Sequence, residues 1–466
     1  MKMSVFNLKN VFVFAAFFAC GLLCAGEKTT AELFAERLGC MARIDFVWGK
    51  RGGDEKCTVV ATLWNADGLA VGCASEIPPT ARFSDLKNFK ARFFRGGTAE
   101  YSAKYLGEDS LSGLAFFKIE NAPKSAVCAG SLERARPRIA DAVWSGFPQE
   151  GTFDLFAMYA SSKVAAVFDG VVSNVMLERG VSMLGTPVFD SRGALVGISA
   201  DCIPENVSIG DPDTDEKVPV ALYSTPNVVI SADTVAAAVA RAPSSPYKNA
   251  RGWLGVVNLD VVKSDAAKIM GIENTAAISV GDVLKNSPAA RAGIVQGDVI
   301  LAVDGKPVPR ADLDSQSVDF LVAAAFLKKP DDELLLRIFD GSSARDVRVK
   351  LSAYPKTFGE SRGEYFKNPD FAVREFLVDD AVSTGVMDAA ARGCVVEYVG
   401  AALARNSNAA AALEVGDRIL EVDSVKIDSF DAAVDAIRKS IEKKSEMIIL
   451  AENSQGSKLV KIRIKK

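Results

Sequence analysis

Short apolar runs, separated by glycine, proline and aspartate, dominate the chain from residue 30 to about residue 240. Such runs, rich in β-branched and aromatic residues and bounded by turn formers, are typical of strands. Many short strands at this spacing predict an all-β barrel or sandwich. The runs cover residues 57–64, 91–94, 114–119, 142–146, 165–172, 188–189 and 194–198.

The pattern changes after residue 240. Residues 241–251 are rich in proline, serine and basic residues and predict a linker. Beyond it, a short helix, a Gly-Asp turn and a strand occur twice, with the turns at Gly297-Asp298 and Gly416-Asp417. The two turns are 119 residues apart, which predicts two small domains rather than a solenoid.

The N-terminus predicts an export signal over residues 1–26. Lys2 and Lys9 form a positive region, an apolar stretch follows to Leu23, and small residues then offer a cleavage site. The alternative is a membrane anchor, but the stretch is shorter than the roughly 20 residues that a spanning helix needs. Cys20 and Cys24 lack a good lipid-attachment context, so no lipid anchor is expected. We expect an exported protein of the periplasm or cell envelope.

Composition removes many enzyme classes, because the 466-residue chain contains no histidine. Histidine is the usual general base near neutral pH and the commonest metal ligand. A Ser-His-Asp or Cys-His hydrolase and a His-ligated zinc site are therefore excluded. The net charge of -4 gives no electrostatic footprint for nucleic acid, and no cofactor-binding glycine loop is present.

Six cysteines remain after the predicted signal, an even number in an oxidising compartment where disulfides persist. Sequence alone leaves their pairing open. No CxxC pair is among them, which argues against a structural zinc site or a redox motif. They are Cys40, Cys57, Cys73, Cys128, Cys202 and Cys394.

The repeated segments resemble PDZ domains of the HtrA/Deg (high-temperature-requirement) periplasmic serine proteases. In the first copy, Arg251-Gly-Trp-Leu-Gly-Val256 resembles the family's carboxylate-binding loop, and Ser-Pro-Ala-Ala and Gly-Asp-Val-Ile-Leu follow at the family's spacing. With that anchor, residues 30–240 resemble the family's trypsin-like double β-barrel. The resemblance implies a mainly β fold: a double barrel at 30–240, a linker at 241–251, and PDZ domains at 252–355 and 358–466.

The resemblance also places the family's catalytic triad, and this chain lacks all three residues. Ser75 stands where the histidine is expected, Gly113 where the aspartate is expected and Leu184 in the place of the serine. A serine hydroxyl is a weak nucleophile until an adjacent base takes its proton. The prediction is a degenerate, inactive protease domain. The alternative is a displaced nucleophile at Ser182 with Lys163 or Lys118 as an unorthodox base.

The first PDZ copy is predicted to bind peptides. In this fold a peptide adds a strand to a sheet edge, and backbone N–H groups of a glycine-containing loop capture its terminal carboxylate. That loop is Trp253, Leu254, Gly255 and Val256, and a helix over residues 318–327 forms the other wall, with Phe320 and Ala324 as pocket residues. The alternative is that Trp253 and Val256 are core residues of a strand.

The second PDZ copy is predicted to serve structure or protein docking instead. Its loop has Asp370 where glycine is expected, and a negative charge there repels an incoming carboxylate. Residues 211–215 resemble the start of a calcium loop, but Glu216 and Leu222 stand where glycine and glutamate are required. We interpret them as an exposed acidic loop.

These features predict an HtrA-like pseudoprotease that binds C-terminal or unfolded peptides as a chaperone, adaptor or scaffold. Two alternatives remain: a working endopeptidase with an unorthodox base, and a non-catalytic partner of an active family member. The family resemblance implies trimers formed through the barrel domain.

Overall fold

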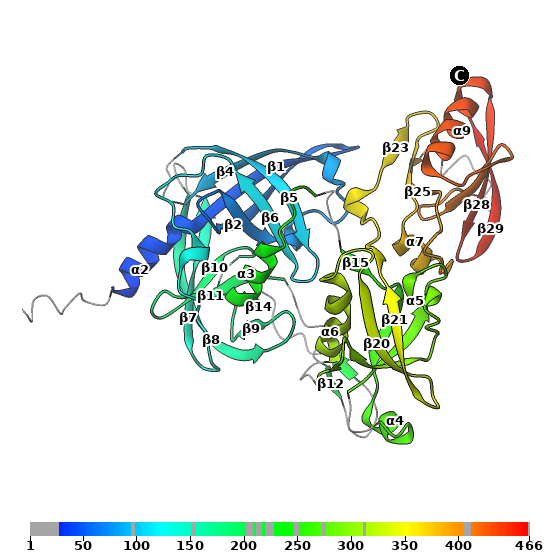
Figure 1. The fold of residues 1–466 in the computed structure, drawn as a ribbon. Coiled ribbons are helices and arrows are strands. Elements are labelled where there is room, and N and C mark those ends of the chain that lie inside the picture. The colour runs from blue at the N-terminus through cyan, green and yellow to red at the C-terminus, as the bar shows by residue number, and fades with distance from the viewer. Residues whose placement is uncertain are drawn as a thin grey trace, which may run out of the picture.

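The computed structural model describes residues 28–94, 98–150, 155–181, 183–201, 208–210, 217–219, 228–246, 251–272, 276–310, 314–401, 403 and 412–464. Two β-barrels occupy one end of the molecule and two smaller sheet units the other (Figure 1). The predicted signal peptide lies outside the described residues. Among those that are described, no helix is long and apolar enough to cross a membrane.

The first barrel closes in the strand order β1-β2-β3-β6-β5-β4. Strand β6 is apolar on both faces because Ala115 and Phe117 point into this barrel's core, whereas Leu114 and Phe116 belong to the cluster shared with the second barrel. The strands are β1 (Met41–Lys50), β2 (Gly53–Leu63), β3 (Leu69–Cys73), β4 (Leu86–Phe93), β5 (Tyr101–Asp109) and β6 (Leu114–Ile119).

The second barrel closes in the order β10-β11-β14-β9-β8-β7. Its strands are β7 (Ala142–Glu150), β8 (Leu155–Phe168), β9 (Asn174–Leu177), β10 (Pro187–Asp190), β11 (Leu195–Ala200) and β14 (Val228–Ser231); β12 (Ser208–Gly210) and β13 (Lys217–Pro219) form a separate pair. Helix α2 (Thr30–Arg37) precedes the barrels and α3 (Ala232–Ala240) follows them. Both helices begin where a side-chain oxygen, of Thr29 or Ser231, accepts a backbone N–H of the first turn.

The first PDZ unit is a sheet in the order β16-β17-β18-β20-β21, with β16 at the edge. Helix α6 packs beside β16 (Figure 1). The elements are β15 (Gly252–Trp253), β16 (Val256–Val261), α4 (Ser264–Ile269), β17 (Ile278–Val283), α5 (Pro288–Arg291), β18 (Val299–Val303), β19 (Lys306–Pro307), α6 (Asp314–Phe326), β20 (Glu333–Phe339), β21 (Ala344–Lys350) and β22 (Ser352–Ala353).

The second PDZ unit repeats this order and adds a strand, giving β23-β24-β25-β26-β28-β29. Its elements are β23 (Gly363–Phe366), β24 (Phe371–Glu375), α7 (Val378–Ser383), β25 (Cys394–Val399), β26 (Arg418–Val422), β27 (Val425–Lys426), α9 (Phe430–Lys443), β28 (Glu446–Asn453) and β29 (Gly456–Arg463). Five short 3-10 turns complete the described structure: η1 (Leu38–Cys40), η2 (Ala74–Glu76), η3 (Phe83–Asp85), η4 (Ala129–Ser131) and η5 (Phe358–Glu360).

The structure confirms the predicted fold class, a trypsin-like double barrel with a PDZ domain after it. The segment predicted as a linker is anchored at both ends: Arg241 donates to Asp109 at 2.8 Å, and Arg251 lies 3.6 Å from the same carboxyl. The five cysteines that are described are all free thiols, and Cys202 lies outside the described residues. The acidic loop at 211–215 lies outside them as well.

Candidate functional site

The three positions predicted to replace the triad meet where the two barrels touch. Ser75 lies in η2, directly after β3, and the N–H of Ala74 donates to the carbonyl of Gly113 at 2.9 Å. Leu184 packs against the hydrophobic cluster that includes Cys73 and Leu114. Three segments far apart in sequence therefore border the contact between the two barrels.

The next residue, Gly185, shows how closely the barrels approach. A Cβ on Gly185 would lie 1.8 Å from the carbonyl oxygen of Val60 and 3.3 Å from the Cα of Gly72. The carbonyl of Gly185 accepts a hydrogen bond from the Thr62 hydroxyl at 2.8 Å. Only glycine fits there, so the contact fixes the loop that carries Leu184 against β2 and β3.

The polar groups described next to Ser75 are a thiol and a carboxyl. The Ser75 Oγ lies 3.2 Å from the buried thiol sulfur of Cys73. The neighbouring Glu76 has a buried Oε2 with no hydrogen-bond partner. Burial raises the pKa of Glu76 to about 8, although the backbone N–H of Val60 favours its charged form. Sequence reasoning missed this carboxyl, because nothing in the local pattern indicates its burial.

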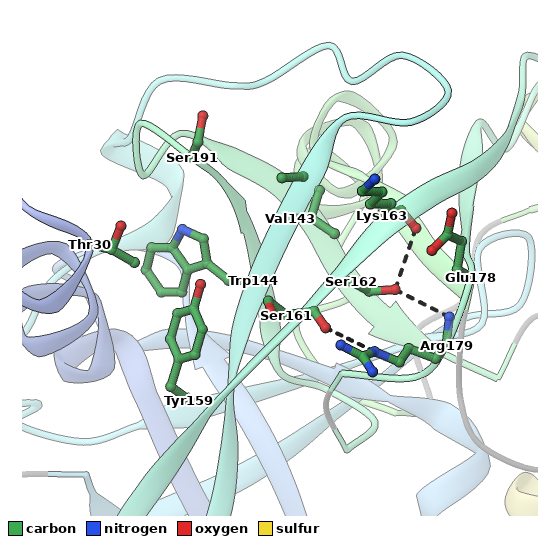
Figure 2. A pocket seen from close by; sticks show the side chains of 11 residues that line it. Thr30, Val143, Trp144, Tyr159, Ser161, Ser162, Lys163, Glu178, Arg179 and Ser191 are labelled. Carbon is green, nitrogen blue, oxygen red and sulfur yellow. Dashed lines mark hydrogen bonds between the residues drawn. The ribbon is translucent and has the colours of Figure 1, made fainter.

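Lys163, one of the predicted alternative bases, lies elsewhere on the second barrel. It is exposed on β8 and lines a cavity of about 640 Å³ together with Glu178 and Trp144. Figure 2 shows this cavity, in which Arg179 donates its backbone N–H to the Ser162 hydroxyl and its Nε–H to the carbonyl of Ser161. None of the three triad positions lines it. Ser182 lies outside the described residues, and Lys118 is the penultimate residue of β6, opposite Leu69 of β3 and Lys104 of β5.

The loop between β15 and β16 in the first PDZ unit has two unpaired backbone donors. Its carbonyls are occupied, because Leu254 accepts from Ala289 at 3.0 Å and Gly255 accepts from Leu284 at 3.1 Å. Within the described part of the chain, the N–H groups of Leu254 and Gly255 donate to no acceptor. The edge of β16 is also unpaired among the described strands. The loop thus presents N–H groups at the end of an open sheet edge.

Gly255 is required for this geometry. Its φ of +82° lies in the left-handed region that glycine adopts without strain. A Cβ there would lie 2.3 Å from the Cβ of Ser287, which is fully buried and caps α5. The side chain of Ser287 accepts the N–H of Ala290 at 3.1 Å and cannot move aside without losing that cap.

A cavity of about 280 Å³ lies beside the loop. Trp253, Leu254, Gly255 and Val256 all line it, as the sequence predicts. Of Trp253 and Val256, for which a core role is the alternative, Val256 packs against the domain core, in which the neighbouring Leu254 is buried. The helix wall differs from the prediction: Leu321, Val322, Ala325 and Phe326 of α6 line the cavity, whereas Phe320 and Ala324 do not and pack against the domain core. The predicted phase of the helix is wrong by one residue.

A third wall of the cavity comes from outside the first PDZ unit. Tyr354, Pro355, Lys356 and Thr357 of the connecting segment, and Val378, Asp379 and Val382 of α7, line it as well. The N–H of Lys285 donates to the carbonyl of Met387 at 2.9 Å, so backbone contacts hold the two units together. No sequence signal identified this wall, because it depends on how two domains pack.

The corresponding edge in the second PDZ unit is occupied by the chain itself. Strand β23 pairs antiparallel with β24 along its whole length, from Gly363 opposite Arg374 to Phe366 opposite Phe371. Side chains just before and within β23 contact α9, since Arg362 pairs with Asp431 at 2.9 Å and Glu364 with Arg438 at 2.5 Å. Strand β23 therefore takes the place that a peptide would take in a PDZ groove.

Asp370, predicted to repel a carboxylate, has internal partners in the same unit. Its Oδ1 accepts the hydroxyl of Tyr365 at 2.9 Å, and its carbonyl accepts the N–H of Gly400 at 2.8 Å. Next to this pair, the guanidinium of Arg51 from the first barrel lies 4.6 Å from the ring of Tyr365 and 3.7 Å from that of Tyr398. The loop end of the second unit thus receives a cation of its own chain.

A second arginine of the first barrel also contacts this unit. Arg82 pairs with Glu397 at 2.5 Å and stacks on Phe358 at 5.6 Å. Its side chain is mostly buried, and a Cβ at Gly363 would meet it at 2.4 Å. Arg51 and Arg82 together attach the second PDZ unit to the first barrel.

These observations define the class of protein: a trypsin-like double barrel followed by PDZ-type units. Residues 279–326 match the family model described as PDZ domain. The HtrA-type protease AlgW with a bound tripeptide shares the fold, with a TM-score of 0.51, 18% identity, and coverage of 71% of this chain and 98% of that one. A form of the same protease with a decapeptide matches at a TM-score of 0.51 and 16% identity, covering 70% and 98%.

The chain is homologous to the HtrA/DegP-type periplasmic serine endoproteases. A DegP-like periplasmic serine endoprotease of Pseudomonas fulva (strain 12-X) is 28% identical over 266 residues, 56% of this chain and 50% of the relative. One of Brucella suis biovar 1 (strain 1330) is 28% identical over 371 residues, 77% of this chain and 65% of the relative. The chain thus spans about half to two thirds of the length of the curated relatives it matches.

Proposed function

We propose that this chain is an exported, HtrA-like pseudoprotease that binds peptide C-termini through its first PDZ unit and acts as a chaperone, adaptor or scaffold in the cell envelope. One observation supports the loss of catalysis: the chain has no histidine, and the positions predicted for the triad are Ser75, Gly113 and Leu184. Without its triad, such a site retains only the roughly 10³ to 10⁴-fold acceleration of its oxyanion hole and binding.

The geometry of the first PDZ unit supports the binding half of the proposal. Among the described residues, the N–H groups of Leu254 and Gly255 have no acceptor, and they lie at the end of the open edge of β16, beside a cavity lined by apolar and polar side chains. This arrangement suits an extended peptide with a free carboxylate. Solved HtrA-type relatives carry a tripeptide or a decapeptide, which agrees with a peptide ligand here. Trimer formation and a periplasmic location follow from the homology as expectations of the same proposal.

A second candidate function is proteolysis with an unorthodox base. It is favoured by the relatives, which are described as serine endoproteases. The exposed Ser75 beside Glu76, whose pKa is raised to about 8, and the serine at position 182 are the groups on which such an activity depends.

Digestion of unfolded casein by the purified chain tests the two candidates. We expect no cleavage above the background of a Ser75→Ala, Ser182→Ala double variant, and no labelling of either serine by a fluorophosphonate probe. Cleavage that the double variant loses, with labelling of one serine in the unaltered chain, contradicts the loss of catalysis. An active HtrA protease assayed in parallel shows that the casein is cleavable under the same conditions.

A further inference from the structure

The cavity of the first PDZ unit is incomplete without the second unit. The loop with β16 forms one wall and α6 the second, both from the first unit. The third wall is α7 with the connecting residues 354–357. A ligand that fills this cavity of about 280 Å³ therefore contacts both units at once.

Within the third wall, helix α7 presents two valines and one carboxylate to the cavity, and the connecting segment adds Lys356. Val378 and Val382 are four residues apart, so they share one face of α7. Asp379 lies between them in sequence, is exposed, and lines the same cavity. The part of the wall that α7 forms thus combines an apolar surface with one carboxylate.

Asp379 is the charged group of this wall that has no partner. Among the described residues, it makes no hydrogen bond and no ion pair, whereas the adjacent Asp380 is held by Arg374 through two contacts of 2.7 Å. Lys356, the basic group lining the cavity, is paired with Glu375 at 3.1 Å. Among the described residues, the Asp379 carboxyl therefore has no direct ion pair at the rim of the cavity, although burial and the adjacent Asp380 raise its pKa and Arg374 lowers it.

We propose that α7 completes the peptide site of the first PDZ unit and that Asp379 makes the site select C-terminal peptides carrying a basic residue among their last positions. The inference rests on the proposed peptide-binding function. An apolar side chain fills the space between α6 and the two valines of α7. A lysine or arginine pairs with Asp379 and offsets the repulsion between Asp379 and the carboxylate captured at Leu254 and Gly255.

Fluorescence anisotropy with labelled hexapeptides tests this selection on the full chain at low salt. The peptides end in a free-acid valine in an alanine background, with lysine or glutamate placed in turn at each of the last three positions before the valine. We expect one position at which lysine binds about three- to five-fold more tightly than glutamate, the range for a solvent-exposed charge pair. The preference disappears in Asp379→Asn and reverses in Asp379→Lys.

Asp265→Lys is the matched control. Asp265 lies on α4 of the first unit, its side chain is 91% exposed, and it does not line the cavity. Asp265→Lys changes the net charge by the same amount as Asp379→Lys. Because position 265 is outside the cavity, we expect the ratio of affinities for the lysine and glutamate peptides to equal that of the unaltered chain. Because both aspartates are exposed, thermal unfolding of all variants is expected to match and confirms that they are folded.

The outcomes separate this inference from the proposed function. If no peptide binds, or if amidated peptides bind as tightly as free acids, carboxylate recognition fails and the inference fails with it. Binding that depends on the free C-terminal carboxylate of the peptide supports the proposed function. If, in that case, Asp379→Lys leaves the ratio of affinities for the lysine and glutamate peptides unchanged, only the role of α7 is overturned.

Discussion

Gly255 carries the strongest constraint of any single residue in the peptide site. Its backbone is left-handed, and its missing side chain leaves room for the buried cap residue Ser287. The same unit contains Gly293, whose φ is +77° but whose Cβ would have no atom within 4 Å. The two glycines thus share a backbone requirement and differ only in the space around them.

Replacing each glycine by alanine separates backbone strain from steric conflict. Both Gly255→Ala and Gly293→Ala are expected to lose about 1–2 kcal/mol of unfolding free energy, because alanine is strained in the left-handed region. Only Gly255→Ala also displaces the loop, so its affinity for a free-acid peptide falls at least tenfold. Chemical denaturation and anisotropy measure the two effects, and equal peptide affinity in both variants contradicts carboxylate capture at this loop.

At the residue scale, the sequence predicts features that depend on residue type better than it predicts the direction in which a side chain points. The absence of histidine and the glycine of the loop follow from the sequence alone, since each depends on residue type. The sequence predicts a helix beside the pocket, but it does not predict which face of the helix lines it. Because neighbouring residues on a helix point about 100° apart, Leu321 and Ala325 line the cavity instead of Phe320 and Ala324. Asp370 accepts hydrogen bonds from Tyr365 and Gly400. Residue type does not reveal these partners, because they depend on which strands and loops lie side by side.

At the scale of elements, β16 and β24 hold equivalent places in two sheets of the same order but differ at their outer edge. Strand β16 has no outer neighbour among the described strands, whereas β24 is paired on both sides, with β23 and β25. A strand with a neighbour on one side leaves alternate N–H groups without a ladder partner. The difference decides which unit can accept a peptide strand.

Hydrogen exchange of the intact chain measures this difference directly. We expect alternate amides in residues 256–261 to exchange about ten-fold or more faster than the amides of 371–375, because exchange follows local opening of paired groups. A saturating free-acid peptide then protects residues 256–261 and leaves 371–375 unchanged. Protection of β24 by peptide would contradict occupation of that edge by β23, and an amidated peptide serves as the control.

Most strands were predictable, because continuous apolar runs such as those of β6 and β11, which are buried on both faces, stand out between turn-forming residues. The pairing of β23 with β24 was not. Residues 363–366 form a short strand without a strong apolar pattern, and their place follows from contacts with α9 that are distant in sequence.

At the scale of the whole molecule, the domains are joined by arginines. Arg251 is largely buried, donates to the carbonyl of Glu108 at 2.8 Å, and lies 4.1 Å from the ring of Phe326 on α6. Arg51 and Arg82 attach the second PDZ unit to the first barrel. Together with the backbone hydrogen bond from Lys285 to Met387 between the two PDZ units, these contacts set the orientation of the domains, and that orientation brings α7 to the cavity of the first PDZ unit.

Removing both barrel contacts should release the second unit. The double variant Arg51→Ala, Arg82→Ala loses two cation–aromatic clusters and one mostly buried ion pair, which together contribute about 2–3 kcal/mol to docking. Small-angle X-ray scattering is expected to record a larger radius of gyration. Arg337→Ala is the control, because this exposed arginine pairs only with Asp346 of its own sheet. An unchanged radius in the double variant would contradict a docking role of the two arginines.

Domain orientation is the level that the sequence predicts least. Residues 241–251 have the composition of a flexible linker, yet Arg241 and Arg251 both reach Asp109, which is almost fully buried. The composition of a segment describes its own conformational freedom, whereas these contacts depend on a carboxyl more than a hundred residues away.

The occupation of the second PDZ edge by β23 sets the valency of the molecule. A strand tethered beside its own groove acts at an effective concentration in the millimolar range, so a free peptide of micromolar abundance cannot compete with it. On the proposed function, the two PDZ units of each chain then offer one peptide site rather than two. The two PDZ units of one chain therefore give no avidity for a single long ligand. Multivalent binding of an unfolded protein then requires several chains assembled together.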